Sequence, residues 1–156
     1  MPGFFFLANG EHYTKNQNSK ITSCDLLTGN EIETIFDAEN DSFKSILNGP
    51  ISNYLFSADE QKLLILVNQE AIYRRSSKAN VFFFDIKTKR LSSIENGKKI
   101  GYPTFSPDGN KVAYVLENNL FIWDIFTNTS ISVTSDGSKN NLINGAGDWV
   151  YEEEFG

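Results

Sequence analysis

A turn cluster recurs along this chain about every 50 residues. In its clearest copy, FSPDGNKVAYV at 105–115, a proline presets the backbone angle φ and a glycine accepts the positive φ that other residues resist. Weaker copies are FSADEQKLLIL at 56–66 and FLANGEHY at 6–13. The corresponding turn residues, 50 and 49 positions apart, are Asn9, Asp59 and Asp108. A chain with this repeat is expected to fold as a series of similar units, each containing a hairpin.

A second element recurs downstream of each turn, where an aspartate ends a strand-like run and begins a tight turn. These aspartates follow their turn residues by 16, 26 and 16 positions and are Asp25, Asp85 and Asp124. The middle copy therefore carries about ten extra residues, near 68–78. We expect these residues to enlarge a loop of the repeat, and such loops often carry function.

Aromatic and β-branched residues alternate with turn clusters over the whole chain, which predicts an all-β fold. A period near 50 residues, with four strand-sized segments per copy, is typical of four-stranded antiparallel β-propeller blades. The predicted blades are about 1–48, 49–97 and 98–147, with the acidic segment 148–154 leading toward a next blade. Because propellers typically close with about 4–8 blades, these three predict a partial propeller. Its open strand edges are expected to pair with a second copy and form a homodimer.

Charge and composition exclude several classes of function. The 156 residues carry 14 Lys+Arg against 20 Asp+Glu, a net charge of -6, so no nucleic-acid surface is predicted. The longest apolar runs, at 4–8, 63–67 and 81–84, are too short for a membrane span or a signal-peptide core. Cys24 is the single cysteine and His12 the single histidine, so neither a disulfide nor a metal site is predicted, and no cofactor is expected.

Two charged segments are candidates for binding. DWVYEEE at 148–154 places three consecutive carboxylates beside two large aromatic side chains. Such close negative charges repel one another unless a nearby cation neutralises them. The extra residues of the middle copy supply the opposite charge at Arg74 and Arg75. Ordinary exposed loops remain the alternative for both segments. A glycosidase that uses two of the carboxylates is disfavoured, because adjacent glutamates are poorly placed to flank a bond from two sides.

Four motifs occur in an order that resembles the dipeptidyl peptidase IV branch of the prolyl oligopeptidase family of serine peptidases. NGAGDWVYEEE at 144–154 is similar to the signature of that branch, and the stretch from YRRS at 73–76 through FDI at 84–86 is similar to its arginine loop. FSPDG at 105–109 and LFIW at 120–123 lie between them in the expected order. The resemblance covers essentially the whole chain.

The resemblance implies the N-terminal part of an eight-bladed propeller that caps a C-terminal α/β-hydrolase domain. Members of the family release N-terminal dipeptides, Xaa-Pro or Xaa-Ala, from peptides with a free N-terminus. Their catalytic Ser, Asp and His lie in the hydrolase domain, and this sequence contains no Gly-x-Ser-x-Gly elbow. No catalytic residue is therefore predicted here, and the chain is expected to be inactive without the missing hydrolase domain.

By the same resemblance, the substrate-binding residues are Glu153, Glu154 and Arg74. The glutamate pair would bind the α-ammonium group of the peptide, which is largely protonated at neutral pH because its pKa is about 7.7–8.0. Arg74 would donate a hydrogen bond to a carbonyl of the substrate's N-terminal part. The flanking residues, which match the motifs more weakly, are Glu152, Arg75 and Tyr151.

The resemblance also implies a periplasmic or exported location for the parent protein. The alternative, from another functional class, is a stand-alone propeller-type module that binds a protein partner and catalyses nothing. Continuation of the coding sequence past Gly156 into further blades and a Gly-x-Ser-x-Gly elbow would separate these two interpretations.

Overall fold

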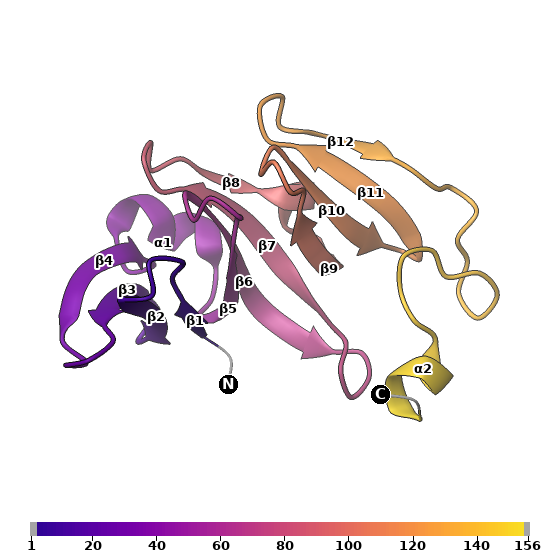
Figure 1. The fold of residues 1–156 in the computed structure, drawn as a ribbon. Coiled ribbons are helices and arrows are strands. Elements are labelled where there is room, and N and C mark those ends of the chain that lie inside the picture. Colours follow the sequence, from indigo (N-terminus) through magenta and orange to yellow (C-terminus); the bar gives the residue numbers. More distant parts are fainter. Residues whose placement is uncertain (1–2, 155–156) are drawn as a thin grey trace.

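The computed structural model describes residues 3–154, which form two antiparallel sheets with short helices beside them (Figure 1). The first sheet has four strands in chain order. They are β1 (Phe4–Phe6), β2 (His12–Gln17), β3 (Lys20–Asp25) and β4 (Glu31–Asp37). Helix α1 (Asp41–Leu47) connects this sheet to the next one.

The second sheet contains eight strands that divide into two sets of four along the chain. The first set is β5 (Ile51–Phe56), β6 (Lys62–Ala71), β7 (Ser77–Asp85) and β8 (Leu91–Ser93). The short 3-10 helix η1 (Ile94–Gly97) follows. The second set is β9 (Lys99–Phe105), β10 (Lys111–Leu116), β11 (Asn119–Asp124) and β12 (Thr129–Ser132). The all-β prediction is confirmed, and the blade boundaries stay predictions.

The two sets of strands are joined where the beginning of β7 pairs with the beginning of β9. Lys78 lies opposite Gly101 and Asn80 lies opposite Lys99. On its other edge β7 pairs with β6 from Ser77 to Asp85, and residues 82–84 of β7 pair with β8. In Figure 1 the β9–β12 set therefore lies beside the β5–β8 set, and the β1–β4 sheet lies on its other side.

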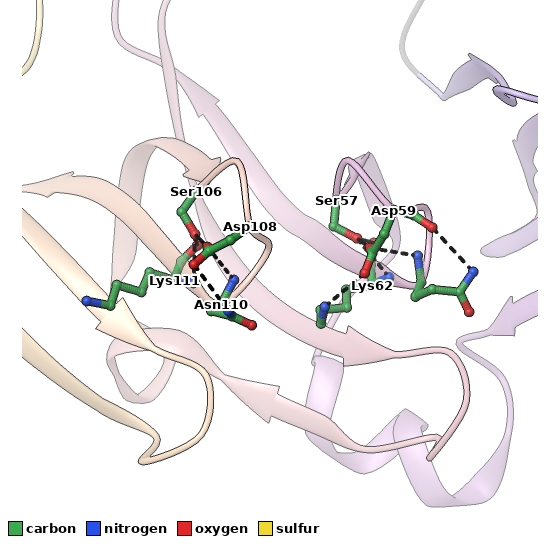
Figure 2. A network of polar contacts seen from close by, with 8 residues as sticks. Ser57, Asp59, Lys62, Ser106, Asp108, Asn110 and Lys111 are labelled. Carbon is green, nitrogen blue, oxygen red and sulfur yellow. Dashed lines mark hydrogen bonds and ion pairs between the residues drawn. The ribbon is translucent and has the colours of Figure 1, made fainter.

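The recurring turn of the sequence is a recurring set of hydrogen bonds (Figure 2). The Ser106 hydroxyl donates to Asp108 Oδ1 at 2.5 Å and accepts the Lys111 backbone N–H at 3.0 Å. In the preceding copy, Ser57 makes the same two bonds to Asp59 and Lys62, at 2.5 and 3.0 Å. The similar polar residues at these positions thus close the same turn twice.

Two apolar clusters lie on opposite faces of β6 and β7. Side chains alternate between the two faces of a strand, and in β6 Leu63 and Ile65 join the cluster toward the first sheet while Leu64 and Leu66 join the cluster toward β9–β12. Both clusters are fully or almost fully buried. Burial on both faces explains why β6 reads as a continuous apolar run rather than an alternating one.

The extra residues of the middle copy form an extended hairpin rather than the enlarged loop that we expected. β6 and β7 continue their pairing outward to Ala71 and Ser77, past a register break that coincides with the positive φ of 52° at Asn68. The tip is closed by the Ile72 N–H, which donates to the Ser76 carbonyl at 2.9 Å. The tip is therefore carried at the end of two paired strands.

Within residues 3–154, no helix combines the length and the apolar character needed to cross a membrane.

Candidate functional site

The acidic segment forms a short helix, α2 (Trp149–Glu153). Asp148 caps it, because its side chain accepts the Tyr151 N–H at 3.0 Å and its carbonyl accepts the Glu152 N–H at 3.1 Å. Successive residues of an α-helix are separated by about 100° around the axis, since there are about 3.6 residues per turn. The three consecutive carboxylates therefore point in three different directions and can have three different partners.

Glu153 lies against the tip of the β6–β7 hairpin. The backbone N–H of Arg74 donates to Glu153 Oε1 at 2.7 Å, although the two residues are separated by 79 positions in the chain. Figure 1 shows the hairpin tip and α2 beside one another. The two segments that the sequence singled out by opposite charge thus meet in the fold.

The contact between these segments is not a side-chain ion pair. In the part of the chain that the structure describes, neither Arg74 nor Arg75 forms a salt bridge, and both side chains are exposed. Glu154 is also exposed, and its backbone N–H donates to the Val150 carbonyl at 2.9 Å. The guanidinium of Arg74 and the carboxylate of Glu154 therefore lie at the surface beside a half-buried Glu153.

Glu152 has a different partner, Tyr102 of β9. The Tyr102 hydroxyl donates to Glu152 Oε1 at 2.9 Å. Burial raises the pKa of Tyr102, the Ser76 side chain lowers it, and the Glu152 carboxylate raises it again. The pKa is raised on balance, so this hydroxyl keeps its proton and remains a donor at neutral pH.

Sequence reasoning missed Tyr102, and no local pattern identifies it. It lies where β9 departs from regular pairing, since Gly101 and Thr104 are three residues apart yet face Val115 and Ala113. The extra residue in β9 is a bulge, and Tyr102 adopts a positive φ of 53° there. The sequence contains only the dipeptide Tyr-Pro at this point, and this dipeptide does not predict a bulge.

Two hollows border the meeting point of the hairpin tip and α2. One, of about 650 Å³, is lined by Tyr73 of the tip and by Asp148, Trp149 and Tyr151 of the acidic segment, among others. The other, of about 430 Å³, lies on the hairpin and is lined by Tyr73, Arg74, Arg75 and Ser76, among others. Of the residues predicted from the resemblance, Tyr151 therefore lines the first hollow and the two arginines line the second.

Across residues 3–154, histidine, cysteine, aspartate and glutamate side chains form no group of three or more that could hold a metal ion.

The stacked antiparallel units, packed face to face through apolar clusters, define a portion of a β-propeller. A family model for the dipeptidyl peptidase IV (DPP IV) N-terminal region matches residues 57–156. The chain belongs to this family, which confirms the resemblance in the sequence motifs.

Individual relatives agree with this assignment. Dipeptidyl aminopeptidase B of Saccharomyces cerevisiae is 34% identical over 136 residues, covering 79% of this chain and 16% of that protein. Dipeptidyl peptidase 4 of Felis catus is 29% identical over 144 residues, covering 92% of this chain and 18% of that protein. The crystal structure of Porphyromonas gingivalis dipeptidyl peptidase 4 superposes with a TM-score of 0.85 at 37% identity, covering 99% of this chain and 22% of that one. The chain thus spans about a fifth or less of the length of these proteins.

Proposed function

We propose that this chain is the substrate-binding propeller portion of a serine exopeptidase that releases N-terminal dipeptides, Xaa-Pro or Xaa-Ala. Its three antiparallel units are three consecutive blades of an eight-bladed propeller that gates the active site of an α/β-hydrolase domain. The substrate is a peptide with a free N-terminus, and the parent protein is periplasmic or exported. The relatives named as dipeptidyl peptidases support this proposal.

The observation that carries the proposal is the contact between Arg74 and Glu153. It brings a guanidinium and carboxylates to one surface without using the guanidinium itself in an ion pair. A dipeptide with a free amine offers the complementary pattern, because its ammonium suits Glu153 and Glu154 and its first carbonyl suits Arg74. Charge-assisted hydrogen bonds of this kind are about twice as strong as neutral ones.

The proposed contacts would also select a dipeptide unit, because they fix a distance from the N-terminus of the peptide. In this proposal the carboxylates bind the α-ammonium group, and Arg74 binds a carbonyl at a set distance from it. An internal segment of a peptide has no α-ammonium group and cannot make this contact with the glutamates.

The test compares free and N-acetylated peptide substrates in the full-length protein. Glu153→Ala and Glu154→Ala are each expected to lose about 2–5 kcal/mol of transition-state binding for the free peptide, because an ammonium loses a charged partner. Arg74→Ala should weaken both substrates, since both contain the carbonyl. The measurement is kcat/KM for the matched pair, with the exposed turn variant Glu11→Ala as control.

Two outcomes would contradict the proposal. If both glutamate variants keep the full preference for a free amine, the amine anchor lies elsewhere. If the full-length protein cleaves neither substrate but binds a folded protein, the alternative of a non-catalytic interaction module is correct.

A further inference from the structure

Glu152 is the one member of the acidic run whose side-chain carboxylate receives a hydrogen bond from another side chain in the described residues. Its partner, the Tyr102 hydroxyl, lies 50 positions away in β9. Glu153 is bonded instead by a backbone amide, and Glu154 is exposed. The three glutamates therefore differ in their surroundings although they are identical in the sequence.

Tyr102 is held in an unusual backbone conformation. A positive φ at an aromatic residue is strained, and it persists only when the surrounding structure imposes it. The bulge in β9 imposes it here, and bulges beside functional sites commonly redirect a side chain. The side chain that is redirected in this case carries the hydroxyl that reaches α2.

Helix α2 depends on contacts with other elements for its orientation. It has only five residues, none of which is buried, and such a short helix is not stable by its own hydrogen bonds. Two hydrogen bonds join it to strands of the fold, that of Glu152 with Tyr102 and that of Glu153 with Arg74. Glu153 is itself a proposed ligand of the substrate, so of these two bonds the one between Glu152 and Tyr102 can stay in place while substrate binds.

We propose that Tyr102 is a positioning residue that tethers α2 through Glu152 and so sets the direction of the amine-binding carboxylates of Glu153 and Glu154. This inference rests on the proposed function, and it assigns Glu152 a role as a tether in place of a role as an amine ligand. Tyr102 itself does not touch the substrate.

The tether is tested first by amide hydrogen exchange of the full-length protein, read on the peptide that spans residues 148–154. Tyr102→Phe and Glu152→Ala should each speed exchange there by about 3- to 10-fold, because they remove a hydrogen bond to a charged group. Glu152→Gln keeps an oxygen that accepts from Tyr102 and should exchange like the wild type. Tyr54→Phe is the control, since it removes the hydroxyl of another tyrosine, which is buried and bonded to Thr14 at 2.7 Å in a different part of the fold.

The same variants are then compared on the free and acetylated substrates. Tyr102→Phe should raise KM for the free peptide by about 3- to 10-fold with little change in kcat, and it should change the acetylated peptide by less than about twofold. A variant that only destabilises the fold would instead lower kcat for both substrates alike. Tyr54→Phe is expected to show this second pattern if it destabilises the protein. The double variant Tyr102→Phe/Glu152→Ala should be no worse than either single one, because both changes break the same bond.

Three results would overturn the inference. Exchange at 148–154 that is unchanged in Tyr102→Phe means that the hydroxyl does not hold the helix. Unchanged amine preference in Tyr102→Phe, when Glu153→Ala loses it, means that the tether does not orient the carboxylates. A loss in Glu152→Gln as large as that in Glu153→Ala means that Glu152 binds the amine directly. If the glutamate variants themselves keep the preference, the proposed function fails, and hydrogen exchange alone then decides whether Tyr102 holds α2.

Discussion

At the scale of single residues, the turn aspartates hold the repeat together. The pKa of Asp108 lies below its ordinary value, chiefly because the Ser106 hydroxyl donates to it and also because the Asn110 N–H does. The pKa of Asp59 is lowered in the same way, first by the Ser57 hydroxyl. Each turn therefore prefers an ionised carboxylate at one defined point (Figure 2).

The first prediction concerns acid. Because the folded-state pKa of Asp108 is lower than its unfolded value of about 3.9, its contribution to stability is present above about pH 4 and is lost as the pH falls through the folded pKa. Asp108→Asn should reduce the free energy of unfolding at pH 7 and flatten its decline between about pH 5 and pH 2. Urea unfolding over this pH range measures both effects. Asp136→Asn, an exposed aspartate outside the turn repeat, serves as control, and an equal effect in both variants would contradict the prediction.

At the scale of elements, the hairpin formed by β6 and β7 and the segment that ends in α2 are the two parts that build the site. The hairpin is supported by paired strands, whereas the approach to α2 depends on a loop that crosses β10 and β11. At Gly145 the loop backbone lies close to both strands. A Cβ added there would lie 3.0 Å from Val115 Cγ2 and 3.2 Å from Leu120 Cδ1. Its φ of 77° is also unfavourable for any other residue.

The second prediction follows from this crossing. Gly145→Ala should destabilise the protein by about 1–3 kcal/mol, because it combines backbone strain with close contacts. Gly10→Ala has a similar positive φ of 71° but open space around the added carbon, so it isolates the strain alone. Urea unfolding midpoints of the two variants should place Gly145→Ala lower. Amine preference should also fall in Gly145→Ala and remain in Gly10→Ala, and the reverse order would show that the crossing does not position α2.

At the scale of the whole molecule, strand β12 lies at an edge of the second sheet, with no strand on its outer side within residues 3–154. β12 pairs with β11 on one side, and every residue of β12 is exposed. Apolar side chains are prominent on and near this edge, with Ile131 62%, Val133 50% and Phe126 74% exposed. An exposed strand edge with apolar side chains invites pairing with another chain.

The third prediction is that residues 1–156, expressed alone, dimerise or exchange strands in solution. Light scattering coupled to size exclusion over a concentration series should show a mass that rises with concentration. Ile131→Lys should shift the equilibrium toward monomer, because an edge lysine opposes strand pairing. A protein that folds cooperatively and stays monomeric at high concentration would show that the edge is protected.

The helices mark a limit of prediction from sequence. α1 is capped by Asn40, whose side chain accepts the Ser42 N–H at 3.0 Å, and it ends at Asn48 with a left-handed backbone. Two turns of helix are too short for apolar spacing to stand out from strand patterns. For the same reason, the sequence of α2 indicates a charged segment but does not predict a helix.

The amino-acid sequence alone determined the repeat, the all-β class, the extra residues of the middle copy and the motifs of the family. These features depend on interactions within one turn or strand, such as the bonds from Ser106 to residues two and five positions away. Only the tertiary structure decided which glutamate meets which partner. Arg74 and Glu153 lie 79 positions apart, and Tyr102 and Glu152 lie 50 apart. Such contacts depend on how the strand units pack face to face and on one bulge in β9, and these arise from the sum of many burial contributions rather than from any local pattern.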